Sequence, residues 1–411
     1  MKILIVTQYF WPENFRINDL ALGMQERGHQ VTVLTGIPNY PAGDFFPGYG
    51  LFRKTAELWQ GVKIIRAPLI PRGKGGGLRL AVNYFSFAFF ASIWGALRLD
   101  KDFDVIFVHE PSPITVGIPA IVMKRVTGAP ILFWVLDLWP ESVAAAGSVN
   151  HPWVFKALRG LTKWIYKHCN YILVQSRGFI GHTKGMGVTE KRIRYFPSWA
   201  EALYQPIRGE LRADSDLPPG TRIMFAGNIG VSQDFATILD AAEIVKGRLD
   251  IHWVIIGDGR MLPWVRREVA DRGLAQTVHL LGRHSVEKMP GFFAQADALL
   301  VSLKREPIFA STIPGKIQSY LACAKPVIAM LDGEGARIIT EAGAGFTCPA
   351  EDAQALARVA AELAQKDKCE LKTMGDNARL YYEAHFDRET LFPQLEGWMR
   401  QLINKGELEN E

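Results

Sequence analysis

The chain is poor in cysteine and has no strong excess of positive or negative charge. Both features narrow the class of protein that it can be. Only 4 of its 411 residues are cysteine, and these occur without the spacing of metal ligands or of a CxxC pair. This pattern predicts reduced, buried thiols in a cytosolic protein rather than a disulfide framework. The formal net charge is only +5 and 48% of the residues are hydrophobic, as in an ordinary globular protein. No motif for binding RNA or DNA accompanies this composition, so nucleic acid is not expected as a partner.

The first residues lack an export signal. They read MKILIVTQYF, with one lysine followed by a strand-like run, and they contain neither a long apolar segment nor a small-residue cleavage site. We therefore expect the protein to be cytoplasmic.

Two neighbouring stretches favour contact with a membrane surface. From Leu51 to Val82 the chain has seven Lys or Arg residues and one acidic residue, Glu57, and such a stretch attracts phosphate groups. The segment 81–97 is uncharged and aromatic, but its 17 residues are short for a membrane span. It is expected to be a helix on the membrane surface or a buried helix of the first domain, and both hold if one face is exposed. The first reading places the protein peripherally at the inner face of the cytoplasmic membrane.

Short apolar segments alternate with helical ones through the first half of the chain. A helix is expected from Asn18 to Arg27, where Gly28 ends it. Continuous apolar strands separated by helices indicate a parallel sheet covered on both faces. The strands are expected at 2–10, 30–36, 62–69, 103–110, 129–137 and 171–176.

The length and a change in composition predict two domains. A chain of 411 residues is too long for one typical core, and the segment from Phe196 to Pro219 has little periodicity and four prolines, as a linker does. A second α/β series follows it. We predict two Rossmann-like, doubly wound domains facing a cleft, at 1–200 and 201–385. The remaining segment, 386–411, is expected to be a helix that packs back on the N-terminal domain.

Three apolar runs of the second half break at glycine, as buried parallel strands do before a ligand-facing turn. They are FAGNIG (225–230), VIIGDGR (254–260) and LLGR (280–283). Further on, Pro314 and Gly315 open a helix that carries Lys316 on its first turn. Glycine turns and helix openings present free backbone N–H groups to anions, and a lysine adds a full charge. These features predict a site for a nucleotide diphosphate.

The order and spacing of the motifs resemble one family across almost the whole chain. This family is the retaining nucleotide-sugar glycosyltransferases of the GT-B fold, glycosyltransferase family 4. The chain looks most like bacterial enzymes that build O-antigen, colanic acid or capsule repeats, including the fucosamine transferases. The motifs are QYFWPE (8–13), ERGHQVTVLT (26–35), DVIFVHEPSP (104–113), VLDLWPES (135–142), GNIG (227–230), GDG (257–259), ACAKPVIA (322–329) and EAGAGF (341–346).

The resemblance implies roles for individual residues. His109 resembles the second histidine of the family's H-x-H site, which faces the donor sugar, and Asp137 resembles the aspartate on the acceptor side. Without the resemblance, His109 reads equally as a structural histidine and Asp137 as a helix cap. Arg283 resembles the position whose backbone meets the base. The residues that resemble the turns lining the nucleotide are Gly227, Gly257, Asp258 and Gly259.

The chain departs from the family pattern where the diphosphate is usually held. The family's Arg and Lys positions are Asn228 and Gln233, and its two glutamate positions fall on Ser311 and Ser319. The glycine-rich loop of the first domain is replaced by 14–18.

A nucleotide diphosphate still needs donors, so substitutes are expected. Lys316 and Arg16 are the candidate cations, together with Lys304 or Arg305 near the predicted cleft. Asn228 stays within the predicted donor site. Glu306 could reach a sugar hydroxyl and act in catalysis. The hydroxyls of Ser311 and Thr312 could bind phosphate or sugar.

The expected function is transfer of a sugar, an N-acetylated amino sugar, from a UDP-sugar to a lipid-linked glycan with retained anomeric configuration. No D-x-D-like motif stands where a metal-dependent GT-A enzyme would need it, so we expect neither a metal nor a cofactor besides the nucleotide-sugar itself. Two alternatives stay open. One is a nucleotide-sugar 2-epimerase or hydrolase on the same fold. The other is an inactive glycan-binding subunit, which the departures from the family pattern favour.

Overall fold

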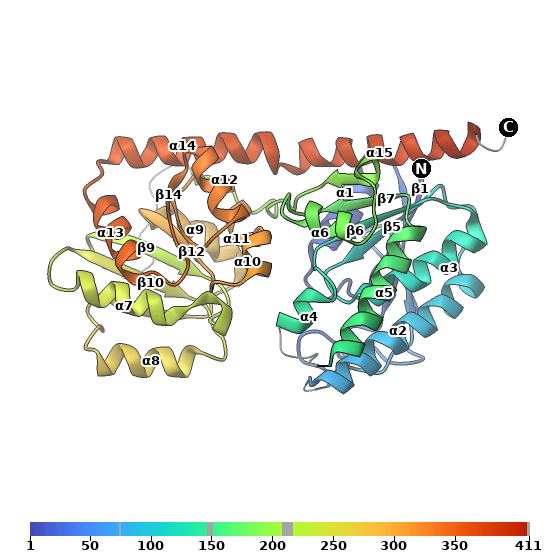
Figure 1. Ribbon diagram of the computed structural model, residues 1–411, viewed down its shortest axis with the longest axis horizontal. Helices are drawn as coiled ribbons and strands as arrows, with labels where there is room; N and C mark the ends of the chain where they lie inside the picture. The colour runs from blue at the N-terminus through green and yellow to red at the C-terminus, as the bar shows by residue number, and fades with distance from the viewer. Residues whose placement is uncertain (74, 146–150, 208–216, 409–411) are drawn as a thin grey trace. The chain divides into compact units, whose positions relative to one another are not determined.

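The computed structural model describes the whole chain except residues 74, 146–150, 208–216 and 409–411. It divides into two compact units (Figure 1). Unit 1 combines Met1–Pro197 with Leu391–Glu411, and unit 2 is Ser198–Thr390. Lys74 of the basic stretch and part of the predicted linker lie outside the described residues.

Unit 1 is built on an eight-stranded sheet in the order β3-β4-β2-β1-β5-β6-β7-β8. All neighbouring strands pair in parallel except β3 and β4. Every residue of β5 and β6 is buried, including His109 and Glu110, the two polar residues that follow the apolar part of β5. The strands are β1 Lys2–Val6, β2 Gln30–Gly36, β3 Ala56–Trp59, β4 Val62–Ala67, β5 Val105–Glu110, β6 Ile131–Val135, β7 Tyr171–Val174 and β8 Ile193–Tyr195.

The helices of unit 1 include one from the end of the chain. In α15, Glu396 pairs with Arg27 and His29 of unit 1, and Gln401 accepts a hydrogen bond from the Tyr171 hydroxyl at 2.9 Å. The helices are α1 Arg16–Glu26, α2 Gly77–Arg98, α3 Gly117–Thr127, α4 Glu141–Ala145, α5 Pro152–His168, α6 Phe179–Gly185 and α15 Arg388–Leu408, with 3-10 turns at η1 Ile114–Val116 and η2 Glu190–Arg192.

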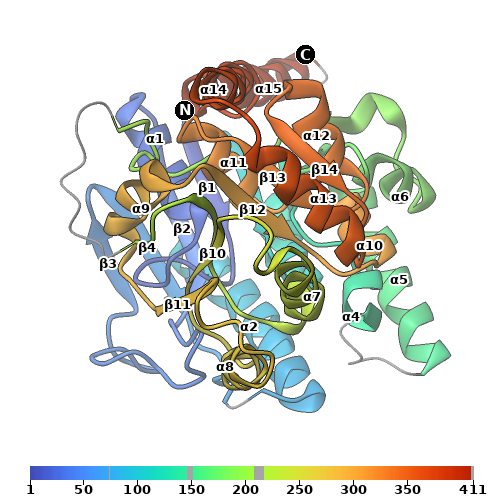
Figure 2. The same ribbon diagram turned by 90° about the vertical axis from the view of Figure 1, so that its left-hand side faces the viewer.

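Unit 2 contains a six-stranded, all-parallel sheet in the order β11-β10-β9-β12-β13-β14. Alternate residues of one strand join different hydrophobic clusters: Met224 packs with α9, α11 and α12, whereas Phe225 packs with α7, α8 and α13. The sheet is therefore covered on both faces (Figure 2). The strands are β9 Thr221–Ala226, β10 Ile251–Ile256, β11 Val278–Gly282, β12 Ala298–Ser302, β13 Val327–Met330 and β14 Gly345–Cys348. The helices are α7 Phe235–Val245, α8 Leu262–Asp271, α9 Met289–Gln295, α10 Pro307–Ser311, α11 Gly315–Ala322, α12 Glu334–Ala342, α13 Ala353–Ala364 and α14 Lys368–His385, with 3-10 turns at η3 Val231–Gln233 and η4 Val286–Lys288.

These elements confirm the predicted doubly wound α/β class, with corrections at the element ends. The strand predicted at 30–36 is confirmed exactly as β2, but those predicted at 2–10 and 129–137 end early, at Val6 and Val135. Helix α1 starts two residues before the predicted Asn18, so Arg16 belongs to its first turn rather than to a loop. All four cysteines are free; three are buried as expected, but Cys369 is exposed on α14.

The apolar segment 81–97 lies within α2, which has one packed face and one exposed face. The residues Asn83, Phe87, Ala91 and Gly95 are buried, and α2 packs beside α3 (Figure 1). The full helix has 22 residues, five more than the predicted segment. Among the described residues it is the one helix long and apolar enough to cross a membrane, but only 28% of the apolar window is buried inside the protein. The helix therefore has one buried face and one exposed face, which is the arrangement in which both expectations can hold.

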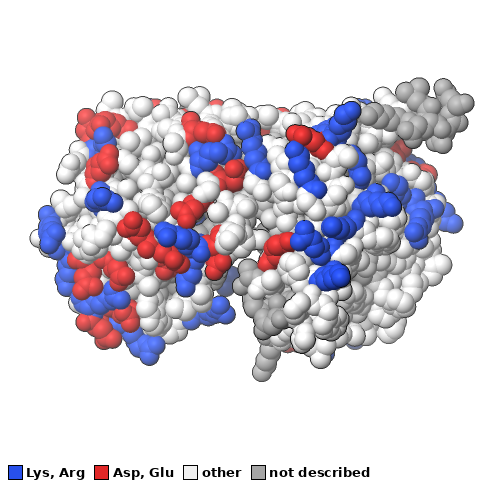
Figure 3. Space-filling view, viewed as in Figure 1, with Lys and Arg blue, Asp and Glu red and all other residues white. Residues whose placement is uncertain are grey.

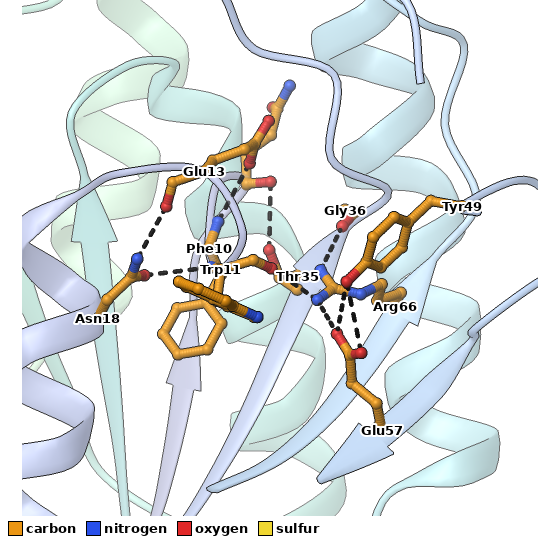
Figure 4. A network of polar contacts seen from close by, with 10 residues as sticks. Phe10, Trp11, Glu13, Asn18, Thr35, Gly36, Tyr49, Glu57 and Arg66 are labelled. Carbon is orange, nitrogen blue, oxygen red and sulfur yellow. Dashed lines mark hydrogen bonds and ion pairs between the residues drawn. The ribbon is translucent and has the colours of Figure 1, made fainter. Parts of the chain in front are cut away.

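Buried polar contacts hold the segment between β1 and α1, which leads into the residues 14–18 that replace the family's glycine-rich loop (Figure 4). The Glu13 carboxylate accepts hydrogen bonds from the backbone N–H groups of Asn39 at 2.8 Å, Tyr40 at 2.7 Å and Phe10 at 3.2 Å. Burial nevertheless raises the pKa of Glu13 to about 7.

The Arg66 side chain, which is fully buried, braces the same segment from β4. It donates to the Trp11 carbonyl at 2.6 Å and pairs with Glu57 (Figure 4). Two charged side chains therefore set the path of the chain after β1.

Candidate active site

A pocket of about 270 Å³ lies in unit 2 where β9, β10 and β11 end. Open α/β sheets bind ligands at this edge. The pocket brings together five of the predicted donor-binding residues, and we call it the glycine-turn pocket. Its lining residues are Gly227, Asn228, Ile256, Gly257, Asp258, Arg283, His284 and Met289.

Glycine is required at two turns of this pocket because the backbones approach closely. Gly227 and Gly257 have φ of +138° and +147°, a region that other residues rarely adopt. A Cβ on Gly257 would lie 1.9 Å from the Gly227 carbonyl oxygen, and one on Gly259 would lie 2.3 Å from the Ile229 carbonyl oxygen. At these turns the floor of the pocket is therefore backbone.

The N–H groups of these turns are not free, which corrects the expectation that they face an anion. Gly227 N–H donates to the Ile256 carbonyl and Gly257 N–H to the Gly282 carbonyl, both at 2.8 Å. Gly259 N–H donates to the Asp258 carboxylate at 2.7 Å. These three glycine N–H groups are therefore occupied, and a phosphate needs other donors.

Besides Arg283, which lines the pocket, the Lys316 ammonium group lies beside its Gly227 turn. It sits 3.5 Å from the centroid of the Phe225 ring, and the Lys316 Cε lies only 2.8 Å from where a Gly227 Cβ would be. The residue as a whole is half-buried, but burial of the ammonium group lowers its pKa to about 7. A charge on this group is costly without an anion, which makes Lys316 a fitting partner for a diphosphate.

The two positions where the family has Arg and Lys are used locally. Gln233 accepts a hydrogen bond from the Gly230 N–H at 3.1 Å through its side chain. The Asn228 amide lies over the same turn, 2.6 Å from where a Gly230 Cβ would be. Both side chains therefore shape the turn after β9, and Asn228 also lines the pocket.

The remaining predicted residues are not brought to the glycine-turn pocket. Ser311 and Thr312 donate their hydroxyl protons to the Pro307 and Ile308 carbonyls at 3.1 and 2.8 Å, so toward a ligand they are only acceptors. Glu306 is exposed just before α10. Arg16 is half-buried in unit 1. None of the four lines this pocket.

In unit 1, His109 ends β5 as a buried, neutral imidazole. The Thr7 hydroxyl donates to the Tyr9 carbonyl at 3.1 Å and lies 3.0 Å from His109 Nδ1. Because a hydroxyl has one proton, its oxygen must accept from Nδ1–H, which leaves the lone pair on Nε2. Burial lowers the pKa of His109 to about 3, so this tautomer persists at neutral pH as a hydrogen-bond acceptor.

Asp137 follows β6 and lines a second pocket of unit 1, of about 550 Å³. Burial raises the pKa of Asp137 to about 6, while Ser142, the Leu138 N–H and Trp139 lower it. The carboxyl group is therefore mainly charged at neutral pH, and it can accept a hydrogen bond from an alcohol hydroxyl.

The sequence did not single out Glu110, the neighbour of His109 on β5. It is fully buried, and burial together with the nearby Asp137 raises its pKa well above the usual range. Its place in the strand sequence VIFVHE was the only available signal. His284 and Met289 of the glycine-turn pocket were also missed, although His284 directly follows Arg283.

No group of three or more His, Cys, Asp or Glu side chains in the described part of the chain is arranged to hold a metal ion.

Solved structures show the class of fold. The chain resembles Anabaena HepE in complex with UDP, with a TM-score of 0.73 at 13% identity over 98% of this chain and 100% of that one. It also resembles sucrose-phosphate synthase from Thermosynechococcus elongatus, with a TM-score of 0.72 at 18% identity over 98% and 99%. The glycosyltransferase WaaG gives 0.67 at 12% identity over 98% and 99%. Together they show the GT-B fold of two Rossmann-like domains.

Two family models cover most of the sequence. Residues 14–199 match the glycosyl transferase 4-like domain and residues 220–366 match glycosyl transferases group 1. Both halves of the chain therefore match glycosyltransferase domains, which confirms the coarser part of the prediction, that the protein is a glycosyltransferase.

Two curated relatives agree with this conclusion. The Probable glycosyltransferase WbjE of Pseudomonas aeruginosa is 27% identical over 285 residues, 67% of this chain and 70% of that one. WcaI of Escherichia coli K12, named for colanic acid biosynthesis, is 24% identical over 337 residues, 78% and 81% of the two chains.

Proposed function

We propose that the protein transfers an N-acetylated amino sugar, with retention, from a UDP-sugar to a lipid-linked glycan during bacterial surface polysaccharide biosynthesis. The observation that carries the proposal is the glycine-turn pocket, where a backbone floor adjoins the buried Lys316 ammonium group. Such a pocket suits a nucleotide diphosphate. The backbone can face its uncharged base and ribose, and the ammonium group can face its diphosphate.

The relatives support the finer parts of this proposal. HepE has been crystallised with UDP and with UDP-glucose, which supports a UDP-linked donor. WcaI is named for colanic acid biosynthesis and AmsK of Erwinia amylovora for amylovoran biosynthesis, which supports a surface polysaccharide as the product. The choice of an N-acetylated sugar rests on the resemblance to the fucosamine transferases.

We infer a front-face substitution that needs neither a metal nor a cofactor. The acceptor oxygen bonds to the anomeric carbon on the face from which the diphosphate leaves, and the acceptor proton passes to a leaving phosphate oxygen. Lys316 neutralises the charge that develops on the diphosphate. His109 Nε2 accepts a hydrogen bond from a hydroxyl of the donor sugar, and Asp137 orients the acceptor hydroxyl.

Release of UDP with and without acceptor tests the function. UDP-N-acetylglucosamine, UDP-N-acetylgalactosamine and UDP-N-acetylfucosamine are offered with lipid-linked glycans extracted from a polysaccharide-producing bacterium. We expect UDP release that depends on the acceptor, and a product whose anomeric coupling constant equals that of the donor. Equal release without acceptor would instead identify a hydrolase or epimerase. Tight UDP binding without release from any donor would identify an inactive subunit.

We also propose that the protein is cytoplasmic and binds the inner face of the cytoplasmic membrane. Phe89 and Leu97 of α2 are 61% and 77% exposed, and basic residues outnumber acidic ones on the face of unit 1 seen in Figure 3. Exposed aromatic residues next to basic ones are typical of interfacial helices.

The protein is expected to sediment with anionic liposomes at low salt and to leave them as salt rises, because exposed charges are screened. Phe89→Glu should reduce this sedimentation, whereas Leu380→Glu, a matched exposed position in unit 2, should not. Absence of binding to anionic and neutral vesicles alike at low ionic strength would refute membrane attachment.

A further inference from the structure

The pocket around Asp137 extends well beyond a single carboxylate. It lies between α2, α4 and α5, and its volume of about 550 Å³ is in the range of sites that enclose a small organic ligand. We call it the α2–α5 pocket. Its lining residues are Gly77, Leu78, Leu80, Ala81, Tyr84, Phe85, Ser112, Thr115, Asp137, Trp139, Ser142, Val143, Val154 and Leu158.

The lining is amphiphilic, and its two kinds of residue come from different elements. The polar side chains come from the segments after β5 and β6, where Trp139 Nε1 donates to Ser112 Oγ at 3.3 Å close to Asp137. Helices α2 and α5 contribute mainly apolar side chains, among them Ala81 and Leu158. A ligand that fits this lining has a polar head and a hydrocarbon part.

The apolar wall continues onto the surface of the protein. Leu78 and Phe85 line the pocket and are also 82% and 51% exposed. Phe89 and Leu97 extend the same exposed row along α2. Isolated exposed apolar residues are common, but a row that leads out of a pocket provides a path for a chain longer than the pocket.

Two arginines adjoin lining residues of the pocket in the sequence, and a phosphorylated lipid requires such positive charge. Arg79 stands exposed on α2 between the lining residues Leu78 and Leu80. Arg159 follows the lining residue Leu158, and its charge helps to lower the pKa of Glu141, which precedes the lining residue Ser142. Arg159 therefore lies on the α4 side of the pocket.

We propose that the α2–α5 pocket binds the hydrocarbon chain of the lipid-linked acceptor next to its phosphate, with the rest of the chain lying along the exposed row of α2. This inference rests on the proposed function, because it names the part of the acceptor that the protein recognises. It makes the lipid a specificity element of the substrate and not only an anchor to the membrane.

Binding of farnesyl phosphate to the full-length protein, measured by calorimetry below its micelle concentration, tests the site. Ala81→Trp fills the pocket and should weaken binding at least about tenfold, as a misfit in an apolar pocket does. Ala96→Trp is the matched control, because Ala96 is also a half-buried alanine of α2 but does not line the pocket. On α5, Leu158→Gln should weaken binding and Leu161→Gln should not. UDP affinity should be unchanged in all four.

Equal affinity of Ala81→Trp and Ala96→Trp for farnesyl phosphate, whether retained or lost, would overturn the proposal. So would a loss of liposome sedimentation in Ala81→Trp that matches its loss of farnesyl phosphate binding, because the occupant would then be a bilayer lipid.

The transfer assay separates this site from the proposed function. If farnesyl phosphate binds as expected but no sugar is transferred to any acceptor, the site stands and the transferase function fails. If transfer occurs and Ala81→Trp has the same acceptor KM as Ala96→Trp, the function stands and the site fails.

Discussion

Turnover is expected to fall at least about a hundredfold when Asp137 is replaced by alanine, while affinity for UDP changes little. The expected loss is large because the carboxylate orients the acceptor hydroxyl, and misplaced reactants react slowly. Asp137 belongs to unit 1 and lies outside the glycine-turn pocket, so nucleotide binding should be preserved.

A loss of similar size is expected for His109→Ala, for a different reason. The Thr7 hydroxyl holds the imidazole so that Nε2 offers its lone pair to the donor sugar. Thr7→Val removes this hydrogen bond without removing the ring, and should therefore lower turnover less than His109→Ala does.

Steady-state rates and UDP calorimetry on the same preparations check both substitutions. Asp100→Ala and His168→Ala are the controls, because Asp100 is an exposed partner of Lys63 and the His168 ring bonds the Trp164 carbonyl of its own helix. Near wild-type turnover in both test variants would return His109 and Asp137 to structural roles.

The pH dependence gives an independent check on Asp137. Burial raises its pKa to about 6, and the charged form is the one that accepts a hydrogen bond from the acceptor hydroxyl and so orients it. The charged form is complete well above pH 6 and is lost as pH falls through 6. The kcat/KM for acceptor should therefore fall about tenfold per pH unit below 6. This acid limb should be missing from Asp137→Asn, and an unchanged limb would assign it to another group.

The second large effect concerns Lys316. Lys316→Ala is expected to weaken UDP binding by about 1.5–3 kcal/mol, the range for a hydrogen bond to a charged group. The ammonium lies against the Phe225 ring and the Gly227 turn, so its removal takes away a positive charge beside the glycine-turn pocket and leaves that of Arg283. Lys316→Arg should rescue only in part, because a guanidinium fork is larger than the space beside Gly227.

Calorimetry with UDP measures the effect. Lys246→Ala is the matched control. Lys246 lies at the exposed end of α7 and donates a hydrogen bond to the Arg272 carbonyl. Unchanged UDP affinity in Lys316→Ala would show that other groups hold the phosphates, with Arg16 the next candidate.

Lys316 should also make UDP binding depend on pH in a defined direction. Its pKa is lowered to about 7 by burial, so the free protein loses this charge as pH rises above 7, and binding must then restore the proton. UDP itself is fully ionised in that range, because its last phosphate pKa is about 6. Affinity should therefore fall by up to about tenfold per pH unit above 7 in the wild type, and stay level in Lys316→Ala.

What could be predicted from the sequence was local in character. The glycines of the pocket were found because a turn that only glycine can form follows directly from the strand before it, as at Gly227 and Gly257. The alternation of strands and helices was found for the same reason.

What could not be predicted depends on which hydrogen bonds and contacts form in the folded chain. The hydroxyls of Ser311 and Thr312 are used by carbonyls of α10, and the amide of Gln233 by the Gly230 N–H. Nothing in a residue's type reveals that its hydrogen-bonding capacity is already taken. Glu110 was missed because a carboxyl within an apolar strand acquires meaning only when Asp137 is brought beside it.

The two ends of the chain together complete unit 1, and this sets an order of events during synthesis. Unit 2 is one continuous segment, Ser198–Thr390, and can fold as soon as it has left the ribosome. Unit 1 begins first but finishes last, because His29 and Tyr171 receive their partners Glu396 and Gln401 only when the final helix emerges. A nascent chain lacking its last residues would therefore contain a finished second half and an incomplete first half.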